Sequence, residues 1–154
     1  MRTLRRRKAS WTKGTQCLAA ASDIFNASVV LDVATMQLTR PGQEDITINV
    51  LGMIDSWSLF AQAFVIKGET SAVCFETAQR GWIAPFGAPL RIFHDAAAAF
   101  RSPTWGEAWG RHGTMVCVSA AEAPWQHGSI EVFWRTLRRA LRLTWRDLAA
   151  QNHM

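Results

Sequence analysis

Residues 29–66 read VVLDVATMQLTRPGQEDITINVLGMIDSWSLFAQAFVI and decide the fold of this chain. Three apolar runs, 29–38, 46–54 and 59–66, are separated by two short polar segments. In the middle run isoleucine and valine alternate with threonine and asparagine, which is the period-two pattern of a β-strand. Because the connections are too short for a crossover, the three runs predict an antiparallel three-stranded meander.

The rest of the chain alternates between helical and extended patterns. We expect a helix at 69–84, a strand at 90–94, a helix at 103–111, a strand at 114–119 and a helix from 129 to about 150. The Pro-Phe-Gly-Ala-Pro segment 85–89 must stop the first helix, and 124–128 is expected to be a loop. This order predicts an α/β fold with a mixed five-stranded sheet, an antiparallel meander plus parallel strands, flanked by helices.

Composition favours one globular domain. A chain of 154 residues with 49% apolar and 19% charged residues is long enough to bury a core and is not typical of disorder. Its longest apolar stretches are too short to span a bilayer, and the first residues lack the apolar region of a secretory signal. We therefore expect no membrane partner.

The net charge of +5 is concentrated in the first residues. Residues 1–20 hold six basic and no acidic residues, which leaves 11 basic and 12 acidic residues in 21–154. We divide the chain into a basic arm, 1–25, and a domain, 26–150. Such an arm suits nucleic acid or nuclear import, and the alternative is that its charge only confers solubility.

The cysteine pattern indicates an intracellular protein. Cys17, Cys74 and Cys117 are odd in number and widely spaced, and neither they nor the histidines have the spacing of a zinc site. We expect all three thiols to be reduced, which is usual inside the cell. Together with the basic arm, this predicts an intracellular and nuclear location.

Three acidic residues stand out by position. Asp32 interrupts an apolar strand, where an unpaired carboxylate is costly, so a ligand role explains it better than a structural one. Asp95 follows a strand end, where α/β sheets place functional groups. Glu131 is separated from Asp95 by 35 residues and, in a first helical turn, could instead complement the helix dipole. Asp55 is the rival for the first position, but it lies in a turn where aspartate is ordinary.

Two blocks around these acids carry a resemblance. Residues 81–95 read GWIAPFGAPLRIFHD, and Pro124, Gly128 and Glu131 precede the segment RTLR at 135–138. With the acid spacing, these blocks resemble the catalytic cores of retroviral and retrotransposon integrases, the enzymes of DNA integration in transposable elements. The resemblance covers about residues 29–143.

The resemblance implies an RNase H-like fold and a chemistry. Asp32, Asp95 and Glu131 would be catalytic and would bind two Mg²⁺ or Mn²⁺ ions, and their oxygen ligands suit those hard cations. The activity implied is that of a polynucleotidyl transferase with possible endonuclease action on phosphodiesters. The partners implied are the DNA ends of an element, target DNA and a second copy of the chain in a homodimer.

The last predicted helix has a basic face. Arg135, Arg138 and Arg142 lie 4, 7 and 11 residues after Glu131, so all four share one stripe. By resemblance, these arginines would contact DNA phosphates; the alternative is a solvated charged face. An apolar stripe beside it predicts the side that faces the core: Ile130, Trp134, Leu137, Leu141 and Leu148.

The chain departs from the integrase pattern beside the expected metal site. Four alanines, 96–99, replace the usual glycine and polar residues after the second aspartate, and Val132 replaces a basic residue. The alternative hypothesis is therefore a catalytically degenerate, retroelement-derived domain that still binds nucleic acid. A nuclease of RNase H type is a third possibility.

Overall fold

The computed structural model describes residues 23–39, 44–118 and 124–151. One sheet runs in the order β3-β2-β1-β4-β5, with β1, β2 and β3 antiparallel and β1, β4 and β5 parallel. Its strands are β1 Ser28–Leu38, β2 Ile46–Asp55, β3 Ala61–Ile66, β4 Arg91–His94 and β5 Met115–Val118. The predicted mixed sheet, with its meander and parallel strands, is confirmed.

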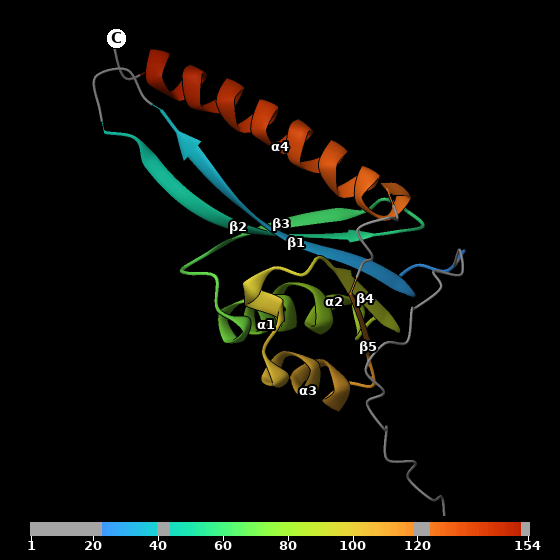
Figure 1. Cartoon of the computed structure of the whole chain (residues 1–154). Helices are drawn as coiled ribbons and strands as arrows, with labels where there is room; N and C mark the ends of the chain where they lie inside the picture. The colour runs from blue at the N-terminus through green and yellow to red at the C-terminus, as the bar shows by residue number, and fades with distance from the viewer. Residues whose placement is uncertain (1–22, 40–43, 119–123, 152–154) are drawn as a thin grey trace, which may run out of the picture.

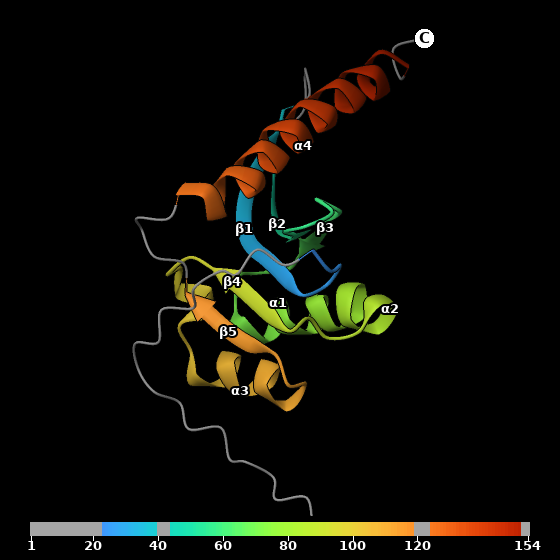
Figure 2. The same cartoon turned by 90° about the vertical axis from the view of Figure 1, so that its right-hand side faces the viewer.

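Helices cover both faces of this sheet. They are α1 Ser71–Ala78, the π-helical turn η1 Gln79–Ile83, α2 Ala84–Phe86, the 3₁₀ turn η2 Ala98–Phe100, α3 Pro103–Arg111 and α4 Pro124–Gln151. Figures 1 and 2 show α4 alone on one face, and α1, α2 and α3 on the other. None of the helices in these described segments is both long and apolar enough to cross a bilayer.

Two hydrophobic cores follow from the alternation of side chains along β1. Val29 and Leu31 point toward α1 and α3, where they join a core containing Trp82 and three further rings of η2 and α3. Val30 points the other way and packs with Trp134 beneath α4. Because both faces are buried, β1 reads as a nearly continuous apolar run, in which a carboxylate stands out.

The first helical stretch ends one residue beyond the proline that marks its end. α1, η1 and α2 follow one another without a break from Ser71 to Phe86, so Pro85 lies in the last turn. The stretch ends at Gly87, whose φ of 82° lies in the region that favours glycine. The segment predicted to stop the helix does so, through its glycine.

The start of α4 corrects one expectation. The loop predicted at 124–128 is wrong, because the helix already begins at Pro124 and includes Gly128. Proline fits the first helical position, where its missing N–H has no intrahelical partner in any case. Glu131 consequently lies about two turns inside the helix. Because the helix dipole acts mainly on the first turn, this position argues against the alternative that Glu131 only complements the dipole. Leu148 is 46% exposed, so the predicted apolar stripe faces the core only as far as Leu141.

The cysteines also depart from expectation. Cys74 is buried and free, whereas Cys117 is disulfide-bonded. The prediction that all three thiols are reduced is wrong at Cys117, and the intracellular location loses that support. Residues 1–22 of the predicted basic arm, and Cys17 with them, lie outside the described residues.

Candidate active site and nucleic-acid interface

The parallel pairing of β1 with β4 brings two of the candidate acids to one level of the sheet. The paired residues run from Ser28 with Arg91 to Val30 with Phe93. Two residues further along each strand stand Asp32, within β1, and Asp95, directly after β4. Continuing the register therefore brings the two positions to the same level of the sheet at the carboxyl end of β4, the edge where α/β sheets bind ligands.

Asp32 is tied to α4. Its Oδ2 accepts a hydrogen bond from Nε1–H of Trp134 at 2.7 Å, and its Oδ1 accepts one from the backbone N–H of Val33 at 2.8 Å. The side chain is half-buried, and both donors complement its negative charge. The carboxylate is thus held in one orientation, with the last helix anchored beside it.

A glycine opposite Asp32 makes room for this contact. Gly52 of β2 pairs with Asp32 across the meander. A Cβ at position 52 would lie 2.7 Å from Cη2 and Cζ2 of Trp134 and 2.9 Å from Cε1 of Phe133. Since contacts below 3.0 Å essentially never occur, the indole reaches Asp32 only because residue 52 has no side chain.

Asp95 and Glu131 are both exposed. Oδ1 of Asp95 accepts the backbone N–H of Ala97 at 2.9 Å, which orients the carboxylate in the turn after β4. Glu131 lies three residues before Trp134 on α4, and therefore close to the Asp32 contact along the helix. In the segments that the structure describes, no group of three His, Cys, Asp or Glu side chains is close enough to hold a metal ion.

The residues present nevertheless fit a hard divalent cation in their chemistry. All three candidate ligands are carboxylates, the type that Mg²⁺ and Mn²⁺ prefer. Both oxygens of Asp32 accept a hydrogen bond, and ligating carboxylates are commonly hydrogen-bonded in this way. The sheet register brings positions 32 and 95 to one level, and α4 packs over β1, but the three carboxylates do not form a closed group in the described segments.

Asp55, the rival aspartate, has a structural environment. It is 1% exposed and accepts hydrogen bonds from the backbone N–H of Asn26 and from both the N–H and the hydroxyl of Ser58, at 2.7 to 2.8 Å. Asn26 in turn accepts the indole N–H of Trp82 at 2.8 Å. These bonds satisfy the buried charge of Asp55 and join the β2–β3 turn to the segment before β1, so Asp55 is not a ligand candidate.

The exposed side of α4 carries more arginines than the sequence stripe contained. Arg135, Arg138 and Arg142 line a shallow surface groove of about 630 Å³ together with Arg139, Leu143 and Arg146. At about 100° per residue, the five arginines occupy roughly a third of the helix circumference, on the side of Glu131. Arg139 and Arg146 lie 8 and 15 residues after Glu131, a spacing that the sequence already offered.

Comparisons with known proteins show which solved structures share this fold. No protein-family model and no curated protein sequence matches the chain. A chain of the simian T-cell lymphotropic virus intasome superposes with a TM-score of 0.70 at 19% identity, over 83% of this chain and 44% of that chain. The present chain thus corresponds to less than half the length of that viral protein.

Two integrase catalytic core domains are similar as well. The magnesium complex of the HTLV-2 core gives a TM-score of 0.57 at 20% identity, over 70% of this chain and 64% of that chain. The BIV core gives 0.58 at 15% identity, over 74% and 68%. The mixed sheet with α4 on one face and α1 to α3 on the other is the RNase H-like fold of retroviral integrase catalytic cores.

Proposed function

We propose that this chain is an integrase-type polynucleotidyl transferase core that cuts and joins DNA strands at Asp32, Asp95 and Glu131. The observation that supports it best is the alignment of Asp32 with Asp95 at the carboxyl end of β4, with α4 anchored to Asp32 through Trp134. The similarity to integrase cores supports the fold on which this site would be built.

The three carboxylates would hold two Mg²⁺ or Mn²⁺ ions. Bound there, the ions would supply activation of water or a DNA 3′-hydroxyl and stabilisation of the leaving oxygen. The chain's own contribution is orientation: the indole of Trp134 and the N–H of Val33 fix Asp32, and the N–H of Ala97 fixes Asp95. Glu131, exposed on α4, would complete the site by turning its side chain toward the aspartates.

The basic groove of α4 would hold the DNA. Its five arginines lie on the side of Glu131, and no acidic residue of the described segments lines the groove. Arginine pairs with phosphate oxygens through charge-assisted, often bidentate hydrogen bonds. Element ends and target DNA are the proposed partners; assembly as a homodimer and a nuclear location belong to the same proposal.

The alternative function is a degenerate domain that binds nucleic acid without turnover. Three observations favour it: the described residues contain no closed three-ligand group, the indole of Trp134 already occupies Oδ2 of Asp32, and residues 96–99 are alanines. Under this alternative, the arginine groove retains its role and the carboxylates lose theirs.

A disintegration assay separates the two functions. A branched DNA that mimics the strand-transfer product is incubated with Mn²⁺ and either the wild-type protein or Glu131→Gln, a variant that keeps size and polarity but loses the charge. The proposal expects resealed product from the wild type and a decrease of at least about 100-fold in the variant, since removal of a charged ligand eliminates a catalytic ion. Equal activity of both proteins would contradict it.

Two controls accompany the assay. Circular dichroism and salt-dependent DNA binding establish that both proteins are folded and bind substrate. Binding without product from either protein would support the degenerate domain. Preferential cleavage of an RNA–DNA hybrid would support a nuclease of RNase H type.

A further inference from the structure

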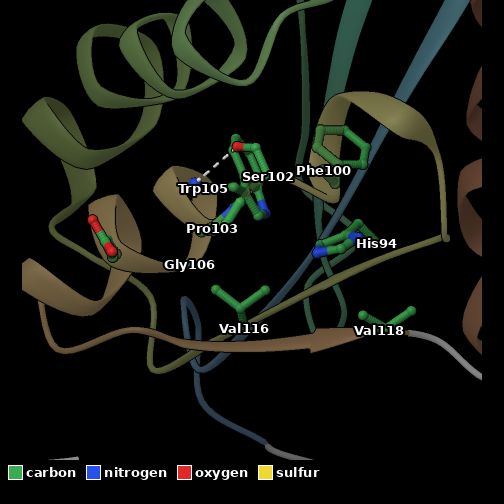
Figure 3. Close-up of a pocket in the computed structure, with 9 residues that line it drawn as sticks. His94, Phe100, Ser102, Pro103, Trp105, Gly106, Val116 and Val118 are labelled. Carbon is green, nitrogen blue, oxygen red and sulfur yellow. Dashed lines mark hydrogen bonds between the residues drawn. The ribbon is translucent and has the colours of Figure 1, made fainter. Parts of the chain in front are cut away.

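A pocket of about 300 Å³ lies beside Asp95, at the carboxyl ends of β4 and β5. It is lined by the paired residues His94 and Val118 at the strand ends, by Val116 of β5, by Phe100 of η2, and by Trp105 and Glu107 of α3. Figure 3 shows His94 and Val118 on one side of this space and Trp105 on the other. The volume is that of a small-molecule site.

His94 presents an unsatisfied acceptor to this pocket. The side chain is 2% exposed, and its Nδ1 lies 2.6 Å from the backbone oxygen of Asp95. Because a carbonyl oxygen only accepts hydrogen bonds, Nδ1 carries the hydrogen. In the neutral imidazole Nε2 is then the acceptor, and it is buried without a hydrogen-bond partner in the described part of the chain.

Trp105, which lines the same pocket, carries an unsatisfied donor. Its indole is 1% exposed, and Nε1–H is buried without a partner among the described residues. The ring centroid lies 6.0 Å from that of His94 and 4.8 Å from that of Phe100. A buried N–H and a buried acceptor left without partners each cost free energy, which a ligand that supplied both hydrogen bonds would recover.

The residues that line the pocket determine which class of ligand it can bind. Its rings and valines suit a flat apolar body, and its two orphaned nitrogens require a neighbouring donor and acceptor on the ligand's edge. Within the described segments no basic residue other than His94 lines the pocket, and the carboxylate of Glu107 disfavours a phosphate there. Every nucleobase combines a flat π-face with adjacent donors and acceptors on its edge.

We propose that this pocket binds a single unpaired nucleobase. The inference rests on the proposed function for the source of the base, which would be a nucleotide displaced from the end of bound DNA. His94, which lines the pocket, directly precedes Asp95 in the chain. A base held there would fix the position of the adjoining phosphodiester relative to Asp95.

Two short duplexes test the pocket. One ends in a single unpaired 3′-adenosine, and the other carries an abasic nucleotide at that position. Fluorescence anisotropy measures the Kd of each. The proposal expects the wild type to bind the adenosine end about tenfold more tightly, the effect of one stacked base. Both His94→Phe, which keeps the ring but loses the acceptor, and Val118→Trp, which fills the space, should abolish this preference and leave the abasic Kd unchanged.

Val65→Trp is the matched control, because Val65 is 68% exposed on β3 at the opposite edge of the sheet. It should retain the preference. If His94→Phe does not fold, Val118→Trp alone decides the variant arm. Equal Kd values for the two duplexes with the wild type would overturn the proposal for DNA.

Adenosine alone separates this proposal from the proposed function. The indole N–H resonance of Trp105, assigned with Trp105→Phe, is followed by NMR during titration with adenosine. A shift without binding of either duplex would support a nucleobase pocket that serves free nucleosides and would contradict the DNA function. Equal duplex binding without a shift would overturn the pocket and leave the DNA function standing. Neither binding nor a shift would overturn both.

Discussion

At the scale of single residues, the pair Asp32 and Trp134 connects the candidate site to the packing of α4. The two are 102 positions apart, and their hydrogen bond of 2.7 Å joins a strand to the last helix. Sequence reasoning singled out Asp32 because a charge in an apolar strand needs a partner. It could not name Trp134, because an indole in an apolar stripe gives no sign of which acceptor its N–H will meet.

The contribution of this hydrogen bond should be measurable as a change in the free energy of unfolding. Trp134→Phe removes the N–H donor and part of the ring that covers Gly52. We expect the free energy of unfolding to fall by about 1–3 kcal/mol, the usual effect of losing a hydrogen bond to a charged group. Urea denaturation measures this, and Trp57→Phe is the control, because Trp57 is 56% exposed. A decrease no larger than that of the control would mean that the bond contributes nothing.

At the scale of elements, α4 combines three features in one helix. Its apolar side packs on β1 and β2, its arginines form the groove, and Glu131 stands beside both. The 3.6-residue period predicted the first two of these sides. The sequence pattern did not predict the start of α4. Pro124 followed by Gly128 indicates a loop unless the proline occupies the first helical position, as it does here.

Two glycine substitutions test the packing of α4 on the sheet and the helical conformation of its first turns. At Gly52 an added Cβ would overlap the rings of Trp134 and Phe133, so Gly52→Ala should destabilise the protein by about 1–3 kcal/mol, as overpacking does. At Gly128, inside α4, a Cβ meets nothing within 4 Å, so Gly128→Ala should stabilise by about 0.5–1 kcal/mol. Thermal and urea unfolding measure both. No increase in stability at Gly128 would contradict the expectation that an added Cβ there costs nothing in packing.

The arginine groove predicts a salt dependence. Replacing Arg139 and Arg146 with glutamine should reduce the slope of log K against log salt for duplex DNA by about 0.9 for each phosphate that these arginines neutralise in the wild type. The matched control is the double replacement of Lys67, after β3, and Arg111 of α3, which are both exposed away from α4. If the control changes the slope as much as the α4 variant, DNA binding is a property of net charge and not of the groove.

At the scale of the whole molecule, the candidate site is a product of topology. Asp32, Asp95 and Glu131 belong to β1, the turn after β4, and α4, three segments far apart in the sequence. Parallel pairing of β1 with β4 sets the level of the two aspartates, and the docking of α4 sets the third residue. A ligand that bridges these elements would hold the fold together.

Metal binding should therefore appear as global stabilisation. A ligand that binds only the folded state contributes about 2.7 kcal/mol at a concentration about 100 times its Kd, so Mn²⁺ should raise the Tm by several degrees. Differential scanning calorimetry with Mn²⁺ and with EDTA measures this. Asp95→Asn should eliminate the increase, while Asp45→Asn, at an exposed residue before β2, should retain it. A Tm that Mn²⁺ does not change would support the degenerate domain.

The sequence by itself determined the five strands, the three main helices and their order, but not the start of α4, because backbone periodicity is a local property that side-chain pattern reports directly. It also identified the three acids and the first three arginines. Only the tertiary structure decided which groups meet: the indole of Trp134 on Asp32, the glycine that admits it, the hydrogen bonds that exclude Asp55, and the pocket between His94 and Trp105. These interactions join residues far apart in the chain, and their distances depend on register and helix docking, which no local pattern encodes.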